Sequence, residues 1–191
     1  EPMSTPPVDQ SGRTWVTMAC AAGGAGGVAT IVPFVSTFQP SERARAAGAA
    51  VEADISTLKP GEMMTVEWRG KPVWILRRSE EQLKALGSLD ADLADPKSER
   101  KPDELTPEYA RNVHRSIKPD VLVAVGICTH LGCSPSTKFQ SGPQASLPDN
   151  WPGGFLCPCH GSTFDLAGRV FKNKPAPDNL EIPPHMYLSD S

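Results

Sequence analysis

Two short stretches of the sequence hold four of its five cysteines and two of its four histidines. G-I-C-T-H-L-G-C-S-P occupies residues 126–135, and F-L-C-P-C-H-G-S-T-F occupies residues 155–164. Each stretch follows or interrupts a β-rich run and is closed by glycine, proline or serine, so we expect two loops at the tips of neighbouring strands. Four thiols and two imidazoles would then converge on one place.

Several chemistries use such a set of side chains. Structural zinc takes four ligands, usually paired with two to four residues between them, and the single residue between Cys128 and His130 is tight for that spacing. A c-type haem needs C-x-x-C-H, whereas Cys157 and Cys159 stand one residue too close. Two disulfides would suit an oxidising compartment but leave both histidines unexplained. A 2Fe-2S cluster held by two cysteines and two histidines, with one disulfide joining the loops, uses all six side chains.

The composition limits the class of protein that carries these loops. The chain has 191 residues and a net charge of -3, and it lacks a Lys/Arg stripe with interleaved aromatic residues. These features exclude a nucleic-acid-binding class. Twenty prolines and sixteen glycines favour a loop-rich, mostly β architecture. The length suits one domain of ordinary size plus an appendage.

The appendage is an uncharged N-terminal run. Residues 14–38 carry no charge and are long enough to cross a bilayer core of roughly 30 Å as a helix. Arg13 precedes the run and Trp15 suits the membrane interface, so the positive-inside rule predicts a cytoplasmic segment at residues 1–13. A cleaved signal peptide is the alternative, but the run is too long for a signal h-region and its small residues suit helix packing in a membrane complex. Cys20 lies in this run and is interpreted as an inert packing or membrane-facing residue.

An Ala-rich stretch follows, and we predict a flexible tether at residues 39–50, with a few extra helical turns as the alternative. From residue 51 the pattern changes to short β-rich runs that predict an antiparallel sandwich or barrel. These runs begin at Met64, Pro72, Val121, Gly154, Gly168 and Met186. Short helices are predicted from Ser79, with a serine cap and an acidic first turn, and from Thr106. Residues 92–104 are interpreted as a solvated surface loop.

At the two loops, C-T-H-L-G-C and C-P-C-H-G-S resemble the paired motif of Rieske iron–sulfur proteins, specifically the Rieske subunit of bacterial ubiquinol-cytochrome c reductases (cytochrome bc1 complexes). The resemblance covers nearly the whole chain: the anchor, the Ala-rich hinge, the β domain and a proline loop, N-K-P-A-P-D-N-L, at residues 173–180. Soluble Rieske ferredoxins and ring-hydroxylating oxygenases lack the anchor and the second cysteine of each motif. The implied fold is mainly β, a Rieske-type head at residues 51–191 with an inserted cluster-binding subdomain at residues 126–172, preceded by one transmembrane helix at residues 14–38.

The resemblance also implies roles for individual residues. Cys128 and Cys157 would bind one iron of a single 2Fe-2S cluster, and His130 and His160 would bind the other. Thiolates concentrate negative charge on one iron, whereas neutral imidazoles leave the other more oxidising. Cys133 and Cys159 would form the disulfide.

Three further positions are implied to tune or use the cluster. Ser162 matches a serine that donates to a bridging sulfide. Phe164 stands where the family often has a tyrosine whose hydroxyl reaches the first cysteine sulfur, so we expect a lower, though still positive, reduction potential than in relatives with that tyrosine. Leu131 matches a residue that packs at the quinol site, with simple shielding of the cluster from water as the alternative.

The implied function is electron transfer from ubiquinol. His160 would accept a hydrogen bond and then the proton from ubiquinol as the electron enters the cluster. The electron would pass to a c-type cytochrome, and the second electron would go to cytochrome b. We therefore expect a subunit that is catalytically incomplete alone, in a dimeric complex of the bacterial inner membrane, single-pass with its head in the periplasm. The alternatives are a Rieske subunit of another periplasmic oxidase, of the arsenite-oxidase type, and a zinc-stapled domain with no redox role.

Three features depart from the family pattern. Gly12 precedes Arg13 where the family's export signal has a twin arginine. The segment at residues 134–154 is longer than in many bacterial relatives and is interpreted as a surface insertion. Relatives usually continue through another strand after the position of Ser191.

Overall fold

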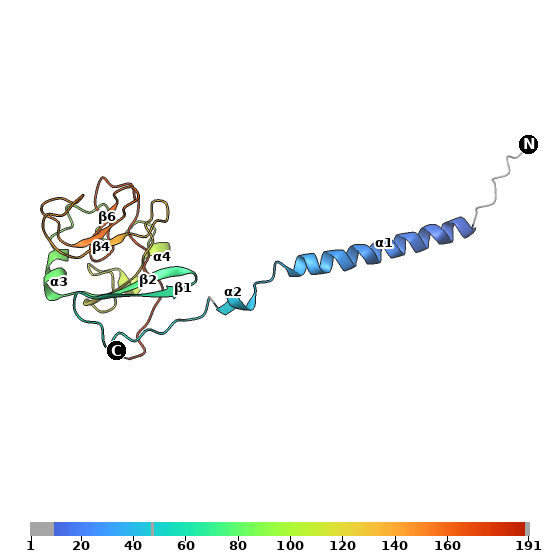
Figure 1. The fold of residues 1–191 in the computed structure, drawn as a ribbon, viewed down its shortest axis with the longest axis horizontal. Coiled ribbons are helices and arrows are strands. Elements are labelled where there is room, and N and C mark those ends of the chain that lie inside the picture. The colour runs from blue at the N-terminus through green and yellow to red at the C-terminus, as the bar shows by residue number, and fades with distance from the viewer. Residues whose placement is uncertain (1–9, 47, 190–191) are drawn as a thin grey trace, which may run out of the picture. The chain divides into compact units, whose positions relative to one another are not determined.

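A computed structural model describes residues 10–46 and 48–189 of the chain (Figure 1). The predicted cytoplasmic segment at residues 1–13 lies largely outside the described residues, as does residue 47 of the predicted tether. The chain divides between residues 46 and 47 into two compact units. The first unit holds helices α1 (Gln10–Ser36) and α2 (Glu42–Ala46).

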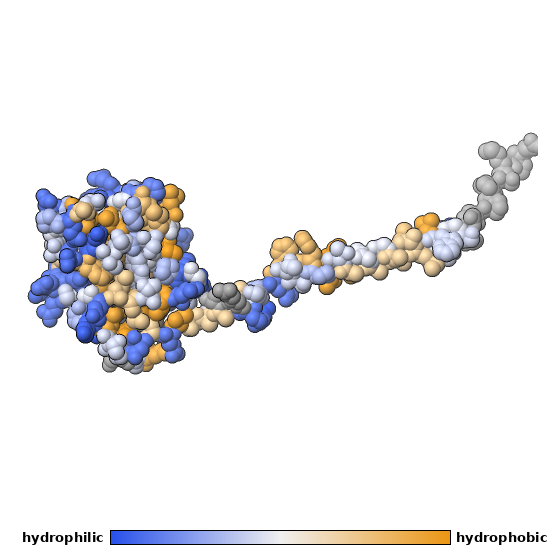
Figure 2. All heavy atoms as spheres, viewed as in Figure 1, coloured by the Kyte–Doolittle hydropathy of each residue, from blue (hydrophilic) through white to orange (hydrophobic). Residues whose placement is uncertain are grey.

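Helix α1 is long and apolar enough to cross a membrane. The most apolar 18 residues of its span Ser11–Ser36 have a mean hydropathy of 1.6, and none of them is buried. Figure 2 shows apolar side chains along the helix. At 1.5 Å per residue its 27 residues extend for about 40 Å. The hydroxyls of Thr17 and Thr30 donate to carbonyls one turn back, so these polar groups are satisfied within the helix. The helix begins four residues before the predicted span and ends two residues before its end, and α2 occupies part of the predicted tether, whose flexibility stays a prediction.

The second unit contains two three-stranded antiparallel sheets. The first has the order β1 (Met63–Trp68), β2 (Lys71–Arg77), β3 (Val121–Val125), and the second has the order β4 (Ser136–Lys138), β5 (Gly154–Leu156), β6 (Thr163–Phe164). Figure 1 shows the β4–β6 sheet above the β1–β2 hairpin. The predicted antiparallel β architecture is therefore confirmed.

Alternation along β2 builds a core on each face of the first sheet. Trp74 and Leu76 pack into the cluster that also contains Cys128 and Cys157. Val73 and Ile75 point to the opposite face and pack against a second cluster of aliphatic side chains. Because successive side chains of a strand point to opposite faces, one seven-residue strand supplies both cores.

The helix predicted from Ser79 is α3 (Glu80–Leu86), and both hydrogen bonds of its capping box with Gln82 are present. It ends before Gly87. The stretch from Thr106 forms only a 3-10 turn, η1 (Glu108–Ala110), with Pro107 as its N-cap.

The interpretation of residues 92–104 as a solvated loop holds for most of their charged side chains, which are exposed, but not for Leu93, Asp95 and Ser98, which are buried. Asp95 is buried, and its carboxylate accepts hydrogen bonds from the backbone N–H groups of Glu99 and Arg100. A short helix, α4 (Pro102–Leu105), follows. The carboxylate caps the local backbone, which lets this charged segment fold against the domain.

Two predicted strands are absent from the described residues. Residues 168–171 make only isolated bridges, at Val170 and Phe171. Side chains bond part of this backbone, since Arg115 donates to the Gly168 carbonyl and Asn179 accepts from the Val170 N–H. Residues 186–189 form no strand, and the two prolines at 183 and 184 before them lack the N–H that a ladder needs.

The segment at residues 134–154 is more than a surface insertion. Ser136–Lys138 forms β4 at its start, and its end contributes a buried tryptophan. Trp151 is 2% exposed, and its Nε1–H donates to the Lys138 carbonyl at 2.8 Å. The Trp151 carbonyl accepts from the N–H of Gly142. The start and the middle of the segment are largely exposed, whereas its end is buried.

Buried arginines hold the chain that follows β6. Arg115 donates to the carbonyls of Ala167, Gly168 and Leu180, and burial lowers its pKa to about 10. Arg169 pairs with the buried Asp165 at 2.8 Å. These bonds satisfy charged groups that would be costly to bury unpaired, and they anchor the segment that follows the second cysteine stretch.

Candidate metal centre

The first cysteine stretch is a tight loop between β3 and β4. The backbone N–H of Cys128 donates to the Cys133 carbonyl at 2.8 Å, and the N–H of Gly132 donates back to the Cys128 carbonyl at 3.1 Å. Gly132 has φ +82°, a left-handed conformation that glycine adopts without steric cost. The loop therefore closes on itself within six residues.

The second stretch, between β5 and β6, repeats this pattern. Cys157 N–H donates to the Ser162 carbonyl at 2.7 Å, and Gly161 N–H donates to the Cys157 carbonyl at 3.0 Å. Gly161 has φ +75°. In both loops the backbone N–H of the first cysteine donates a hydrogen bond to the carbonyl five positions later. The glycine lies four positions after that cysteine. Two loops of one geometry thus present their first cysteine in equivalent positions.

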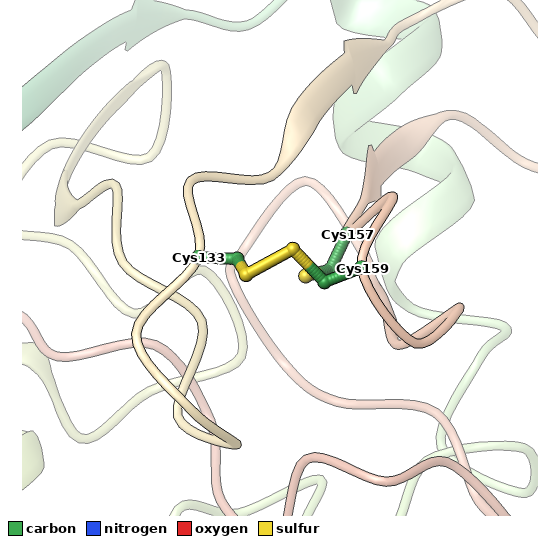
Figure 3. Close-up of side chains that lie close together, drawn as sticks. All are labelled: Cys133, Cys157 and Cys159. Atoms are coloured by element: carbon green, nitrogen blue, oxygen red, sulfur yellow. A yellow bond between two sulfur atoms is a disulfide. The ribbon is translucent and has the colours of Figure 1, made fainter.

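A disulfide joins the two loops. Cys133 and Cys159 are bonded, with their Cα atoms 6.6 Å apart (Figure 3). The sulfur of Cys157 lies within 4.8 Å of both disulfide sulfurs. Disulfide sulfurs carry no thiolate, so Cys157 is the only one of these three that can bind a metal.

Two free thiols belong to the loops that the disulfide joins. Cys128 and Cys157 are each 2% exposed, and the two thiols are close enough to influence each other's titration. Burial raises the pKa of Cys128, and the Cys157 sulfur beside it raises it further, whereas the backbone of His130 and the hydroxyl of Ser162 lower it by hydrogen bonding. A pair of adjacent buried sulfurs fits a metal site, because a bound cation deprotonates coordinating thiols.

The two histidines of the motifs also meet. The ring centroids of His130 and His160 are 4.7 Å apart with an interplanar angle of 85°. His160 is exposed, whereas Nδ1 of His130 is buried and has no hydrogen-bond partner in the described part of the chain. A buried imidazole nitrogen without a partner is costly unless it binds something. Two thiols and two imidazoles with one nitrogen unpaired fit the ligand set of a Rieske cluster.

The three other predicted positions surround this ligand set. Ser162 is fully buried; its Oγ accepts from the N–H of Ala176, and its hydroxyl lowers the pKa of the nearby Cys128 thiol. Phe164 is also fully buried and packs in the same core cluster as both thiols. Leu131 is 71% exposed, in the loop that carries His130. The structure thus joins the two motif loops through the Cys133–Cys159 disulfide and the contact between the His130 and His160 rings, with Ser162 near Cys128.

Two contacts of the site escape sequence reasoning. The Thr129 hydroxyl donates to the Asp178 carbonyl at 2.6 Å, and the N–H of Ala176 bonds Ser162. Asp178 and Ala176 both lie in the proline loop at residues 173–180. The resemblance to the Rieske family pointed to this loop but did not indicate which residues it contacts. The proline loop therefore holds both cysteine loops from one side.

Comparisons with known proteins agree with this geometry. Residues 97–184 match a family model described as "Rieske [2Fe-2S] domain". The chain is 56% identical over 191 residues to the "Ubiquinol-cytochrome c reductase iron-sulfur subunit" of Allochromatium vinosum, covering 100% of this chain and 90% of that protein. It is 38% identical over 190 residues to the protein of the same name from Rhodospirillum rubrum, covering 98% and 93%.

Among solved structures, a chain of "Hyperthermophilic respiratory Complex III" overlaps this chain with a TM-score of 0.45 at 27% identity, covering 90% of this chain and 94% of that one. This overlap is too low to add to the assignment, which rests on the sequence relatives and the family model. The chain belongs to the Rieske [2Fe-2S] family, and within it to the iron–sulfur subunits of ubiquinol-cytochrome c reductase.

Proposed function

We propose that this chain is the electron-transfer subunit that takes an electron and a proton from ubiquinol and passes the electron to a c-type cytochrome. The observation that carries the proposal is that two loops joined by a disulfide hold two buried thiols and two adjacent imidazoles, one of which is exposed. A zinc staple would need no exposed ligand, whereas a redox centre that meets a substrate does. The identity of 56% with a reductase subunit over the whole chain supports the same function.

The ligands would divide as the motifs suggest. Cys128 and Cys157 would hold one iron of a 2Fe-2S cluster, and His130 and His160 would hold the other. Bound there, the cluster supplies one-electron redox chemistry at a positive potential. The buried Nδ1 of His130 supports coordination through that nitrogen, because it has no other partner among the described residues.

His160 would meet the substrate. Its ring is exposed, so the nitrogen not used as a ligand can accept a hydrogen bond from the quinol hydroxyl. The same nitrogen then takes the proton as the quinol is oxidised, which keeps the proton and electron together and avoids a charged intermediate. Leu131 offers apolar contact to the quinol ring from the same surface.

The rest of the chain would place this head beside its partners. Helix α1 has the length and composition of a membrane anchor, and a disulfide between the loops suits an oxidising periplasm. We propose that the head lies in the periplasm, that the anchor spans the inner membrane once, and that cytochrome b and a c-type cytochrome are partners in a dimeric complex.

Metal analysis and low-temperature EPR of the ascorbate-reduced full chain test this function. Two irons and two acid-labile sulfides per chain, with a rhombic signal whose average g lies well below the free-electron value, are expected. The midpoint potential should be positive and should fall with pH in the alkaline range, as proton-coupled reduction of a histidine-ligated cluster requires. Zinc in place of iron, or fully metallated protein without the signal, would overturn the proposal.

A further inference from the structure

Trp74 lies between the two sheets at the base of both cysteine loops. It sits in the middle of β2, paired with Thr65 on one side and Ala124 on the other. It is 4% exposed and belongs to the core cluster that contains Cys128 and Cys157. A tryptophan buried to this degree has a fixed rotamer, because close packing leaves no room for another.

The indole lies directly against the backbone that leads into the first loop. A methyl group placed on Gly126 would lie 2.5 Å from Nε1 and 2.6 Å from Cζ2 of Trp74. Only a residue without a Cβ can approach the ring this closely, so glycine is required here by contact and not by backbone conformation. The N–H of Gly126 donates to the Pro72 carbonyl at 2.8 Å, which keeps the backbone in place. Gly126 stands two residues before Cys128.

The indole also contacts the segment that leads into the second loop. It stacks on Phe155 with a centroid separation of 4.8 Å and an interplanar angle of 18°. Phe155 is fully buried, and Phe139 packs against it edge-on at 5.6 Å. Phe155 stands two residues before Cys157, as Gly126 stands two residues before Cys128.

We propose that Trp74 is a positioning residue that sets the spacing between the two cysteine loops, and hence between the two thiols that the proposed function assigns to one iron. The disulfide ties the loops together beyond their first cysteines, and Trp74 touches both chains just before those cysteines. Each loop is therefore held on both sides of its first ligand. Removing the disulfide would free the part of each loop that follows its first cysteine. Changing the indole would move the backbone that precedes that cysteine.

Trp74→Leu, Trp74→Phe and Ile75→Ala in the full chain, loaded with its cluster, test this role. Ile75 is the matched control, because it is equally buried on the same strand but packs into the opposite core. Trp74→Leu should lower the iron and sulfide content per chain and shift both the EPR g-values and the midpoint potential. Trp74→Phe keeps an aromatic ring beside Phe155, so its cluster content, g-values and midpoint potential should differ less from those of the parent. Ile75→Ala should lower the urea midpoint and leave the g-values and the potential unchanged.

Gly126→Ala approaches the same contact from the other side. The added methyl group should displace the indole and shift the g-values, and the double variant Gly126→Ala/Trp74→Leu should recover cluster content relative to Gly126→Ala alone, because the leucine leaves space. The inference is overturned if both Trp74 variants keep the parental g-values and potential, if Ile75→Ala shifts them as much, or if the double variant shows no recovery. A parent chain without the Rieske signal would instead overturn the proposed function, and this inference with it.

Discussion

The hydroxyl oxygen of Ser162 accepts a hydrogen bond from the backbone N–H of Ala176, with 3.0 Å between the two atoms. Both residues are buried. Because the oxygen accepts from Ala176, its own proton is left to be donated toward Cys128, whose pKa the Ser162 hydroxyl lowers. A segment 14 residues further along the chain thus orients a donor toward a proposed iron ligand.

Ser162→Ala should lower the midpoint potential of the bound cluster. Reduction adds negative charge to the ligand sulfurs, so a hydrogen bond to Cys128 stabilises the reduced state more than the oxidised state. A hydrogen bond to a charged group contributes about 1.5–3 kcal/mol, so the decrease for one electron should be no larger than about 60–130 mV. Redox titration followed by EPR measures it, with Ser136→Ala as the control, because that exposed serine bonds a carbonyl in β4–β5. An unchanged potential would show that the hydroxyl is not a donor.

Phe164→Tyr should raise the midpoint potential, because an added hydrogen-bond donor near the ligand sulfur would stabilise the reduced state. Phe164 is fully buried in the core cluster that contains Cys128, and a phenol there would add a donor near the ligand sulfur. The same titration checks the shift, with Phe171→Tyr, at a partly exposed ring, as the control. A lower potential in a folded, loaded variant would contradict the expected orientation of the ring.

Replacing both disulfide cysteines, Cys133→Ser/Cys159→Ser, should destabilise the head. The crosslink spans 26 residues, and closing a loop of that length in the unfolded chain corresponds to about 3.5 kcal/mol. Urea unfolding should show this loss, and visible absorbance should show faster release of the cluster. Cys20→Ser changes an exposed thiol in α1 and should alter neither measurement. Equal stability of the double variant and the parent would mean that the disulfide contributes nothing.

Leu131→Ala should weaken quinol oxidation by the assembled complex without affecting the fold. The side chain is 71% exposed, so its truncation leaves no cavity, and about 1–2 kcal/mol of apolar contact with the quinol would be lost. Steady-state kinetics should show a raised KM or a lowered kcat, with the urea midpoint and the cluster potential unchanged. Leu188→Ala, at an equally exposed leucine, is the control. Parental kinetics for Leu131→Ala would support simple shielding of the cluster.

Stability should fall as the pH drops below about 6.5, in part through His185. Burial lowers the pKa of His185, and its Nε2 is buried without a partner among the described residues. The unfolded chain therefore binds the proton more readily than the folded chain, and the free energy of unfolding decreases as the pH falls through this range. Urea unfolding at pH 7.5 and 5.5 should show a smaller difference for His185→Gln than for the parent. An identical pH dependence would assign the effect to other groups.

Local signals of the sequence were sufficient where neighbours within a few residues decide the structure. The capping box of Ser79 and Gln82 formed as predicted because its partners are three residues apart. The apolar run became α1, and the alternating run became β2 with one face toward each core. The two cysteine stretches formed loops as predicted, because the hydrogen bonds that close each of them span no more than five residues.

Only the tertiary structure decided the features that depend on residues remote in sequence. Residues 168–171 were predicted as a strand, yet they make only isolated bridges, and the remote side chains of Arg115 and Asn179 bond two of their backbone groups. The N–H of Ala176 donates to Ser162, and Trp74 contacts Gly126 and Phe155. These contacts join segments that no local sequence pattern relates. By itself the sequence determined the chemistry of the site, because residue types and short spacings are written in it. The folded chain decided how that chemistry is held, because burial and long-range hydrogen bonds depend on its path in space.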